Sequence, residues 1–332
     1  MPRSWANEKL EFRCAMTIEQ CVSAQLQDRF KPGTRLLLAI SGGADSILLA
    51  QMLRAMPYRV TWAHINHQMR SNSRADAVFV SALARRWDLP CDIAQVNVPK
   101  YAKRHHLGLE EAARHLRYQA LAKIAARWRC AAILTAHHAD DQAETILMNF
   151  LRGAGPAGLA GMPEVRYWTT SRTVPIVRPL LGVTRREILR TLKKIKLPWR
   201  QDPSNRSVRY MRNRIRHVTL PYLDKLYPGL AGRLVQSADI YRAEEEFWRG
   251  FLPPYLRKTV RKDGRTMTVV LPRLLRYHKA FSRRILRHIL PGLSFQDIEQ
   301  VLTLARSPER TAWLKLSGRR RVKRKKNTLV VA

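Results

Sequence analysis

Residues 35–46, RLLLAISGGADS, constrain the fold of this chain more than any other stretch. The apolar run at 36–40 is typical of a buried strand, and a helical pattern at 47–56 follows the glycines directly. A strand, a glycine-rich turn and a helix in succession bring backbone N–H groups and the positive end of a helix dipole to one point. Such a point binds anions, above all phosphates. The stretch therefore predicts an α/β unit with a phosphate-binding turn.

The turn itself is Ser41-Gly42-Gly43-Ala44-Asp45-Ser46. The glycines let the backbone approach a ligand, the two hydroxyls can donate hydrogen bonds, and Asp45 can hold Mg²⁺ or position an attacking group. An ordinary βα turn explains part of this pattern, because glycines break strands and Asp or Ser caps helices. Two hydroxyls, two glycines and an acid within six residues favour the phosphate site.

No Gly-Lys-Ser/Thr sequence occurs in the chain, so the turn is not a Walker A loop. A Walker lysine binds the β- and γ-phosphates, and its absence argues against a γ-phosphate kinase or a GTPase. SGGxDS resembles the pyrophosphate loop of enzymes that split ATP between its α- and β-phosphates and leave an adenylated substrate. The loop indicates this reaction class and leaves the substrate open.

Strands and helices alternate after the turn. The expected strands are 60–66, 91–98, 131–135 and 174–177, and the expected helices are 75–87, 110–128, 142–151 and 184–196. This rhythm predicts a doubly wound, mostly parallel α/β sheet with helices on both faces. Right-handed crossovers place every strand-to-helix loop at the carboxyl edge of the sheet. The turn at 41–46 should therefore share a crevice with the residues after Asn66 and Thr135.

The 332 residues, 45% of them hydrophobic, suffice for two domains. We expect a loosely ordered extension at 1–16, with Met16 as a second possible start, and an ATP-binding catalytic domain at 17–222. A break near Pro221 would open a linker helix at 230–251 and a smaller basic C-terminal α/β domain, together spanning 223–332. A hairpin is expected at 262–265, and a helix at 281–289.

The chain carries 61 Lys and Arg against 25 Asp and Glu, a formal charge of +36. Such an excess favours a polyanionic partner, with nucleic acid first and an anionic membrane surface second. Seven cations in nine residues at 318–326 predict a phosphate-contacting strand or tail that includes Arg320, Arg321 and Lys323. No stretch has the length and apolarity of a membrane span or the pattern of a secretory signal.

The four cysteines, Cys14, Cys21, Cys91 and Cys130, are scattered and form no CxxC pair. This spacing argues against a disulfide framework, a structural zinc site and an iron–sulfur cluster. It suits a reducing cytoplasm.

Two further stretches should reach the crevice. His64 and His67 could suggest a metal, but no third ligand of fitting spacing is near, and hydrogen bonding to a base or to a loop backbone is the other interpretation. Arg114 follows two glutamates by one helical turn, so local ion pairs account for it. Alternatively, Arg114 and Arg117 share a helical face and could reach a phosphate oxygen.

The densest cluster is Thr135–Thr145, TAHHADDQAET, where a strand becomes a helix. Asp141 and Glu144 are three residues apart and project from the same side. An acid at a helix N-terminus can simply complement the helix dipole, which explains one of the three carboxylates. The others could bind Mg²⁺, or hold a cationic co-substrate and accept its proton.

Together these residues resemble the tRNA(Ile)-lysidine synthetase family of the pyrophosphate-loop superfamily, whose fold is Rossmann-type and adenine nucleotide alpha hydrolase-like. The resemblance covers roughly 36–223, and the C-terminal part looks short, as if it held only one accessory domain of the longer members. The shared motifs are SGGADS (41–46), HINHQMR (64–70), EEAARHLRY (110–118), TAHHADDQAETILMNFLRGAGPAGLAGM (135–162), RPLL (178–181), WRQDPSN (199–205) and RYMRNRIRHVTLP (209–221).

The resemblance implies a ligase that uses ATP and Mg²⁺. ATP adenylates the C2 oxygen of the wobble cytidine in the CAU anticodon of tRNA(Ile) and releases pyrophosphate. The ε-amine of L-lysine then attacks C2 and expels AMP. The lysidine formed changes the codon read from AUG to AUA and the identity from Met to Ile.

The same resemblance implies roles for individual residues. Residues 41–46 would hold ATP, with Asp45 near Mg²⁺, and Arg114 would stabilise charge in the phosphoryl region. His137, Asp141 and Glu144 would bind the lysine and accept a proton from its amine. The residues implied to bind tRNA near the site are Arg212, Asn213 and Arg216, and the basic C-terminal region would bind the acceptor end or other backbone through phosphates.

Three alternatives stay open. A tRNA thiolase of the same superfamily typically needs cysteines for sulfur or a cluster, often as a CxxC pair, and this chain has no such pair. The second alternative is an ammonia-dependent or amidotransferase-type synthetase that acts on a small metabolite. Such an enzyme has no obvious need for a net charge of +36. A basic RNA-binding protein with a vestigial loop fits the charge, but not the intact SGGxDS and the acid-rich cluster.

Overall fold

The computed structural model describes residues 17–68, 73–168, 174–200, 211–264, 266–309, 311–317 and 320–331. Predictions for 1–16, Met69, Arg70, 201–210 and Arg319 fall outside these residues. The chain divides into two compact units, 1–153 with 158–238 and 154–157 with 239–332. This division falls inside one long helix. The functional boundary expected between 222 and 223 stays a prediction.

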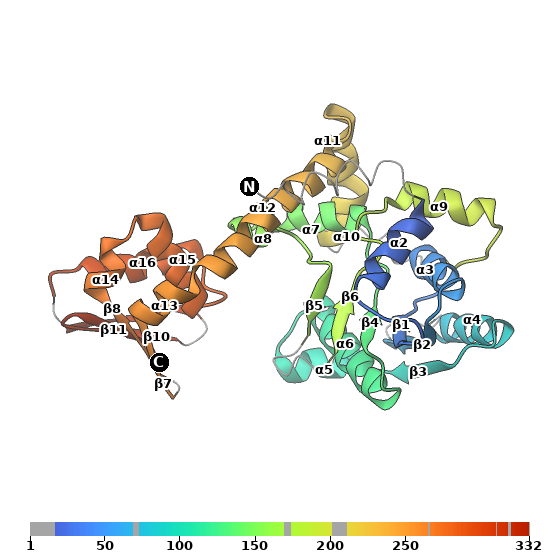
Figure 1. Cartoon of the computed structure of the whole chain (residues 1–332), viewed down its shortest axis with the longest axis horizontal. Coiled ribbons are helices and arrows are strands. Elements are labelled where there is room, and N and C mark those ends of the chain that lie inside the picture. Colours follow the sequence, from blue (N-terminus) through green and yellow to red (C-terminus); the bar gives the residue numbers. More distant parts are fainter. Residues whose placement is uncertain are drawn as a thin grey trace. The chain divides into compact units, whose positions relative to one another are not determined.

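The first unit is built on a six-stranded sheet of order β3-β2-β1-β4-β6-β5 (Figure 1). Its strands are β1 (Arg35–Ala39), β2 (Arg59–Asn66), β3 (Cys91–Gln95), β4 (Ala132–Leu134), β5 (Val165–Tyr167) and β6 (Pro175–Val177). All pairs are parallel except β5 with β6 at the edge. The mostly parallel sheet is therefore confirmed. β3 ends earlier than expected because the Asn97 side chain caps the helix that begins at Val98.

Helices cover both faces of this sheet (Figure 1). The described helices up to residue 251 are α2 (Ile18–Gln27), α3 (Ala44–Arg54), α4 (Ser73–Arg86), α5 (Val98–His105), α6 (Leu109–Arg127), α7 (Ala139–Leu151), α8 (Pro156–Leu159), α9 (Arg185–Lys194), α10 (Met211–Arg214), the π-helix η2 (Ile215–Thr219), α11 (Leu220–Leu226) and α12 (Leu230–Phe251). Leu36 and Leu38 of β1 pack in one core with α2, α3, α4 and α9. Leu37 points the other way and packs in a core with α6. This period-two alternation makes the sheet doubly wound.

The strand order reverses between β1 and β4. The loops that leave these two strands therefore diverge at the carboxyl edge, which is where open α/β sheets bind ligands. α7 begins at Ala139, three residues earlier than predicted, because His138 occupies its N-cap. The earlier start puts Asp140 and Asp141 in the first turn of α7.

The predicted break near Pro221 is wrong. The chain stays helical from Met211 to Leu226. Pro221 lies in the first turn of α11, directly after the π-helix η2. The chain turns instead at Gly229, whose φ is +83°. The helix predicted at 230–251 is confirmed as α12.

The second unit contains a five-stranded antiparallel sheet of order β7-β8-β11-β10-β9. Its strands are β7 (Val260–Asp263), β8 (Thr266–Val270), β9 (Thr311–Lys315), β10 (Arg321–Lys325) and β11 (Thr328–Val331), and its helices are α13 (Pro253–Thr259), α14 (Leu271–Arg276), α15 (Lys279–Ile289) and α16 (Phe295–Arg306). The hairpin expected at 262–265 is confirmed by the β7–β8 pairing. Residues 321–325 of the basic run form the strand β10, which the buried Val322 anchors to the core.

No helix among the described residues is long and apolar enough to cross a membrane. Cys91 and Cys130 are free thiols, and Cys14 falls outside the described residues. Burial raises the pKa of Cys91 to about 11.

Candidate active site

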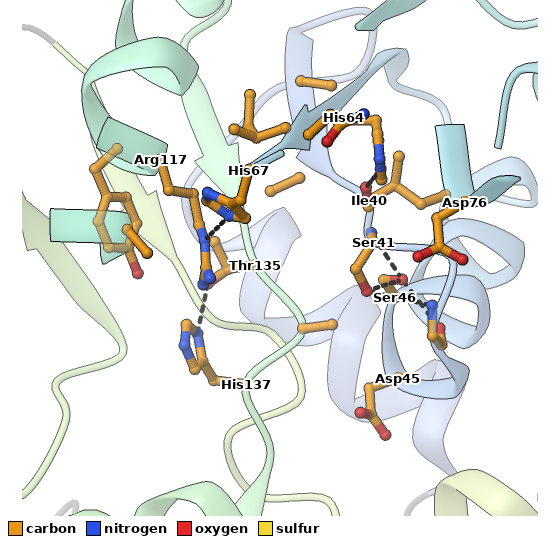
Figure 2. A pocket seen from close by; sticks show the side chains of 18 of the residues that line it. Ile40, Ser41, Asp45, Ser46, His64, His67, Asp76, Arg117, Thr135 and His137 are labelled. Carbon is orange, nitrogen blue, oxygen red and sulfur yellow. Dashed lines mark hydrogen bonds between the residues drawn. The ribbon is translucent and has the colours of Figure 1, made fainter. Parts of the chain in front are cut away.

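A cavity of about 500 Å³ lies at the carboxyl edge of the first sheet, where the strand order reverses. Ser41, Asp45 and Ser46 line one side, and His67, Arg117 and His137 line the other (Figure 2). Gly43 and Asp141 also line it. The cavity therefore unites the turn at 41–46 with the residues after β2 and β4, as predicted.

Hydrogen bonds within the turn hold its shape. The Ser41 backbone N–H donates to Ser46 Oγ at 3.2 Å, and Ser46 Oγ donates to the Gly43 carbonyl at 3.0 Å. The Gly43 N–H donates to Ser41 Oγ at 3.2 Å. Gly43 is also the N-cap of α3, and no side chain caps that helix. The positive end of α3 is thus aimed at the cavity, which suits an anionic ligand.

The backbone conformation at position 42 requires glycine. Its φ is +84°, a region in which a side chain is strained. A Cβ there would also lie 3.3 Å from Phe79 and 3.4 Å from Val80, both on α4. The second residue of the turn must therefore be glycine for α4 to pack against it.

The structure separates Arg114 from Arg117, which both lie on α6. Arg117 lines the cavity, and its Nε lies 3.4 Å from His67 Nε2 (Figure 2). Arg114, the residue expected to stabilise phosphoryl charge, is not among the lining residues, and its guanidinium stacks 5.4 Å from the Tyr118 ring centre. Among the described residues, no ion pair joins Arg114 to the two glutamates of the first turn of α6. The geometry favours Arg117 for the phosphate contact.

The histidines of the cavity differ in charge and bonding. His64 Nδ1 donates to the Ile40 carbonyl at 2.9 Å, and burial lowers the pKa of His64. This is the backbone hydrogen bond that the sequence suggested. His137 Nδ1 pairs with Thr135 Oγ1 at 2.9 Å (Figure 2). Burial, together with nearby arginines, lowers the pKa of His137 to about 3, so its ring is neutral at pH 7.

Two buried carboxylates and two half-buried guanidiniums form one cluster beside the cavity, which Asp141 lines. Arg216 Nε donates to Glu144 Oε1 at 2.5 Å, and its Nη2 donates to Asp141 Oδ1 at 2.7 Å. Arg212 Nε donates to Glu144 Oε2 at 2.8 Å. The Glu144 side chain is 1% exposed. The acids expected to bind lysine and two arginines expected to bind tRNA therefore contact each other, and Asn213 lies half-buried on α10 between those arginines.

The cluster keeps Asp141 ionised. Burial alone would raise the pKa of Asp141, but the positive charges of His138, Arg212 and Arg216 outweigh burial and hold it at about 2. A carboxylate in such a setting binds cations strongly and is a weak base.

His138 was not predicted as a site residue, yet it joins this cluster to the turn. Its ring is buried, with Nε2 3.4 Å from Asp141 and 3.8 Å from Asp45, and Nδ1 3.4 Å from Asp140. Burial alone would lower the pKa of His138, but the hydrogen bond to Asp140 and the charges of Asp141 and Asp45 raise it. The only signal in the sequence was its place directly before the acidic helix.

The sequence profile of the PP-loop domain matches residues 14–223. A tRNA(Ile)-lysidine synthase of Geobacter sulfurreducens is 36% identical over 294 residues, which are 84% of this chain and 61% of the relative. The tRNA(Ile)-lysidine synthase of Thermosynechococcus vestitus is 33% identical over 282 residues, which are 82% of this chain and 78% of the relative. The chain belongs to the tRNA(Ile)-lysidine synthase family.

Members of this family differ in length, and the chain spans about three fifths of the Geobacter relative. A solved structure, the U34-tRNA thiolase NcsA from Methanococcus maripaludis with its [4Fe-4S] cluster, superposes with a TM-score of 0.56 at 18% identity. The match covers 67% of this chain and 77% of that protein. At this identity the likeness concerns the fold, which is that of the PP-loop enzymes.

In this member of the lysidine synthase family, two further arginines lie at the turn. Arg200 lines the cavity, donates its backbone N–H to the Gly42 carbonyl at 2.9 Å, and contacts Asp76 Oδ1 through Nε at 3.1 Å. Arg185 Nη1 lies 3.1 Å from Asp45 Oδ2. The sequence showed Arg200 only as part of the shared motif WRQDPSN (199–205), since its contact with Gly42 spans more than 150 residues.

The donors around Asp45 fit a nucleotide-bound Mg²⁺ with one protein ligand. The described residues include no group of three His, Cys, Asp or Glu side chains arranged to hold a metal. Mg²⁺ in nucleotide sites commonly takes one or two carboxylates and completes its shell with phosphates and water. Asp45 lines the cavity beside Ser46 and can supply that carboxylate if Arg185 gives way.

The tRNA contacts expected in the C-terminal part lie in the second unit. Arg321 and Lys323 are exposed on β10. Arg320 is half-buried, and its Nη1 donates to the Pro291 carbonyl at 2.6 Å.

Proposed function

We propose that this chain is a tRNA(Ile)-lysidine synthase, a C–N bond-forming ligase that converts ATP to AMP and pyrophosphate. The observation that supports this most is that Ser41, Gly43, Asp45 and Ser46 of the turn line one cavity with Asp141, and Glu144 adjoins it. The reaction needs a triphosphate, a cytidine and an amino acid together, and this arrangement offers an anion site beside a cation site.

In the first step, the C2 oxygen of the wobble cytidine attacks the α-phosphorus of ATP, and the bond from that phosphorus to pyrophosphate breaks. The turn and the N-terminus of α3 would hold the phosphates, and Arg117 and Arg200 would supply positive charge that no Walker lysine provides. Asp45 would hold Mg²⁺, which screens the negative charge of the phosphates when it is bound.

In the second step, the ε-nitrogen of lysine bonds to C2 and the C2–O bond to AMP breaks. Asp141 and Glu144 would bind the lysine ammonium in the place of a guanidinium, because the same carboxylates already stabilise two cations. The neutral His137 ring can accept a hydrogen bond from the amine. The bound ammonium must lose one proton before its nitrogen can attack, and a second proton leaves as the N–C bond forms. Because Asp141 and His137 are weak bases, both protons would pass to water.

The substrate RNA would be tRNA(Ile) with a CAU anticodon, with phosphate contacts from the basic second unit. The test is incubation of the protein with ATP, labelled lysine and unmodified tRNA(Ile) bearing CAU. We expect label in the tRNA and one AMP for each lysine transferred. A methionine tRNA with the same anticodon serves as the specificity control.

Failure to label the tRNA, under conditions where ATP–pyrophosphate exchange proceeds, would contradict this assignment. It would point to a different substrate for the same PP-loop chemistry. Trapping an adenylate on the tRNA in the absence of lysine would establish the order of the two steps.

A further inference from the structure

A second cavity, of about 640 Å³, lies within the C-terminal unit and has no part in the proposed chemistry. Its floor is apolar and includes Leu256, Met267 and Val331. The polar groups that surround it are all basic: Arg257, Lys262, His288 and Arg320. No carboxylate of a described residue lines it. The volume falls in the range of about 300–1,000 Å³ that is usual for ligand cavities.

The sheet register explains why apolar and basic groups meet there. Met267 of β8 pairs directly with Lys262 of β7 on one side and with Val331 of β11 on the other. These three side chains therefore form a row on one face of the sheet. Arg261, the neighbour of Lys262, points to the opposite face and does not line the cavity.

The basic groups are arranged as a rim. Arg257, Lys262 and His288 are exposed. Arg320 is fixed at the rim by its hydrogen bond to the Pro291 carbonyl. An occupant with a flat apolar body and negative charge at its edge would match both the floor and the rim.

We propose that this cavity binds the unpaired nucleotides at the 3′ end of the tRNA, with a base on the apolar floor and phosphates at the basic rim. The proposal rests on tRNA being the substrate. A paired base is held in its duplex and cannot lie on the cavity floor, whereas proteins read unpaired bases by splaying them out. The 3′ end is the free single-stranded terminus of a tRNA, whereas most of its loop bases are stacked or paired.

The test compares Lys262→Glu with Arg261→Glu in the full chain. Both variants make the same charge change on adjacent exposed residues of one strand, and only Lys262 faces the cavity. Each is titrated with intact tRNA and with tRNA lacking its unpaired 3′ nucleotides. With intact tRNA, Lys262→Glu should weaken binding about tenfold more than Arg261→Glu. With truncated tRNA the two variants should bind equally.

Met267→Trp provides a second variant, because the larger side chain fills the cavity. The melting temperature of Met267→Trp shows whether the variant is folded. In the folded variant, the affinity for intact tRNA should fall to the affinity for truncated tRNA. The proposal is overturned if the two charge variants weaken intact tRNA equally. It is also overturned if the two charge variants differ in binding to anionic phospholipid vesicles but do not differ in binding to the 3′ end of tRNA.

Lysine transfer measured on the same preparations separates this proposal from the proposed function. Wild-type protein that transfers lysine but binds intact and truncated tRNA equally would overturn the cavity assignment alone. Wild-type protein that transfers no lysine, yet binds the intact RNA more tightly through Lys262, would overturn the proposed function and leave the cavity assignment supported.

Discussion

His137 and His138 are adjacent, yet the protein shifts their pKa values in opposite directions. His137 lies near three arginines, and burial lowers its pKa to about 3. His138 lies among Asp45, Asp140 and Asp141, which raise its pKa. Alternate backbone directions at the end of β4 send the two rings to opposite surroundings. At the residue scale, charge is therefore set by tertiary neighbours, and identical residue types acquire different roles.

The two histidines should affect stability in separate pH ranges. His137 has a folded pKa below its unfolded value of 6.5, so the unfolded state gains a proton that the folded state does not. Its contribution is lost as the pH falls below 6.5, by up to about 1.4 kcal/mol per pH unit. Urea unfolding at several pH values between 4.5 and 6.5 measures this effect. The free energy of unfolding of His137→Gln should change less steeply with pH than that of the wild type.

His138 behaves in the opposite sense. Because its folded pKa is raised, its stabilisation is present below pH 6.5 and is lost as the pH rises through the raised value. His138→Gln should flatten the alkaline side of the stability profile and leave the slope from pH 4.5 to 6.5 nearly unchanged. Equal effects of the two variants in both ranges would contradict these charge assignments.

Asp45→Asn should abolish adenylation with little effect on folding. Asp45 lines the cavity, and its pair with Arg185 is partly exposed, at 24% and 43%, so the pair adds little stability. We expect ATP–pyrophosphate exchange to fall by about 10²–10³-fold. Asp88→Asn, at an exposed turn after α4, is the control. A large drop in melting temperature for Asp45→Asn would assign the residue a structural role instead.

Arg200→Gln should weaken ATP binding about tenfold, as loss of one charge-assisted hydrogen bond does. The guanidinium lies at the rim of the cavity, held beside the turn by the backbone bond to Gly42. Equilibrium binding of a non-cleavable ATP analogue measures the effect. Arg190→Gln, on the exposed side of α9, is the control and should bind the analogue like the wild type. Equal affinities of the two variants for the analogue would rule out a contact between Arg200 and ATP.

At the element scale, the π-helix η2 positions the arginine cluster. Ile215 of η2 is buried with Ala143 and Leu147 of α7, and this packing faces Arg216 toward Glu144. α-, π- and α-helical turns follow one another without a break from Met211 to Leu226. Single-turn π-helices occur frequently at functional sites. Periodicity in the sequence did not reveal this segment, because charged residues mask the short apolar face.

Ile215→Ala should therefore destabilise the first unit by about 2–5 kcal/mol, the usual cost of a buried cavity of this size. Val218→Ala is the control, since Val218 belongs to the same π-helix and its side chain is 52% exposed. The control should change stability by less than about 0.5 kcal/mol. Urea unfolding measures both, and similar losses for the two would show that η2 does not dock through Ile215.

At the scale of the whole molecule, the charge of +36 needs a polyanion or counterions to offset self-repulsion. The first unit places several of its arginines against carboxylates near the site, whereas Arg321 and Lys323 are exposed on β10 of the second. The second unit also pairs Lys279, Arg283 and Arg284 with glutamates, so Arg321 and Lys323 are the cations that we propose to contact tRNA phosphates.

Replacing Arg321 and Lys323 together by Gln should weaken tRNA binding and reduce its salt dependence. Each phosphate contact adds about 0.9 to the slope of log K against log salt, so the loss should be up to about two. Lys193→Gln with Lys194→Gln removes the same charge from exposed positions on α9. If both double variants lower the slope of log K against log salt equally, tRNA binding depends on the net charge of the protein, and β10 makes no specific contact with the tRNA.

The sequence by itself determined the doubly wound sheet, the shape of the turn at Gly42 and the union of that turn with the acids after β4. Alternating strand and helix patterns and right-handed crossovers leave few other arrangements, so local patterns suffice. The tertiary structure alone decided that Arg117 rather than Arg114 faces the cavity and that Arg212 and Arg216 meet Asp141 and Glu144. These contacts join residues that are distant in the chain, and their geometry depends on how whole helices pack.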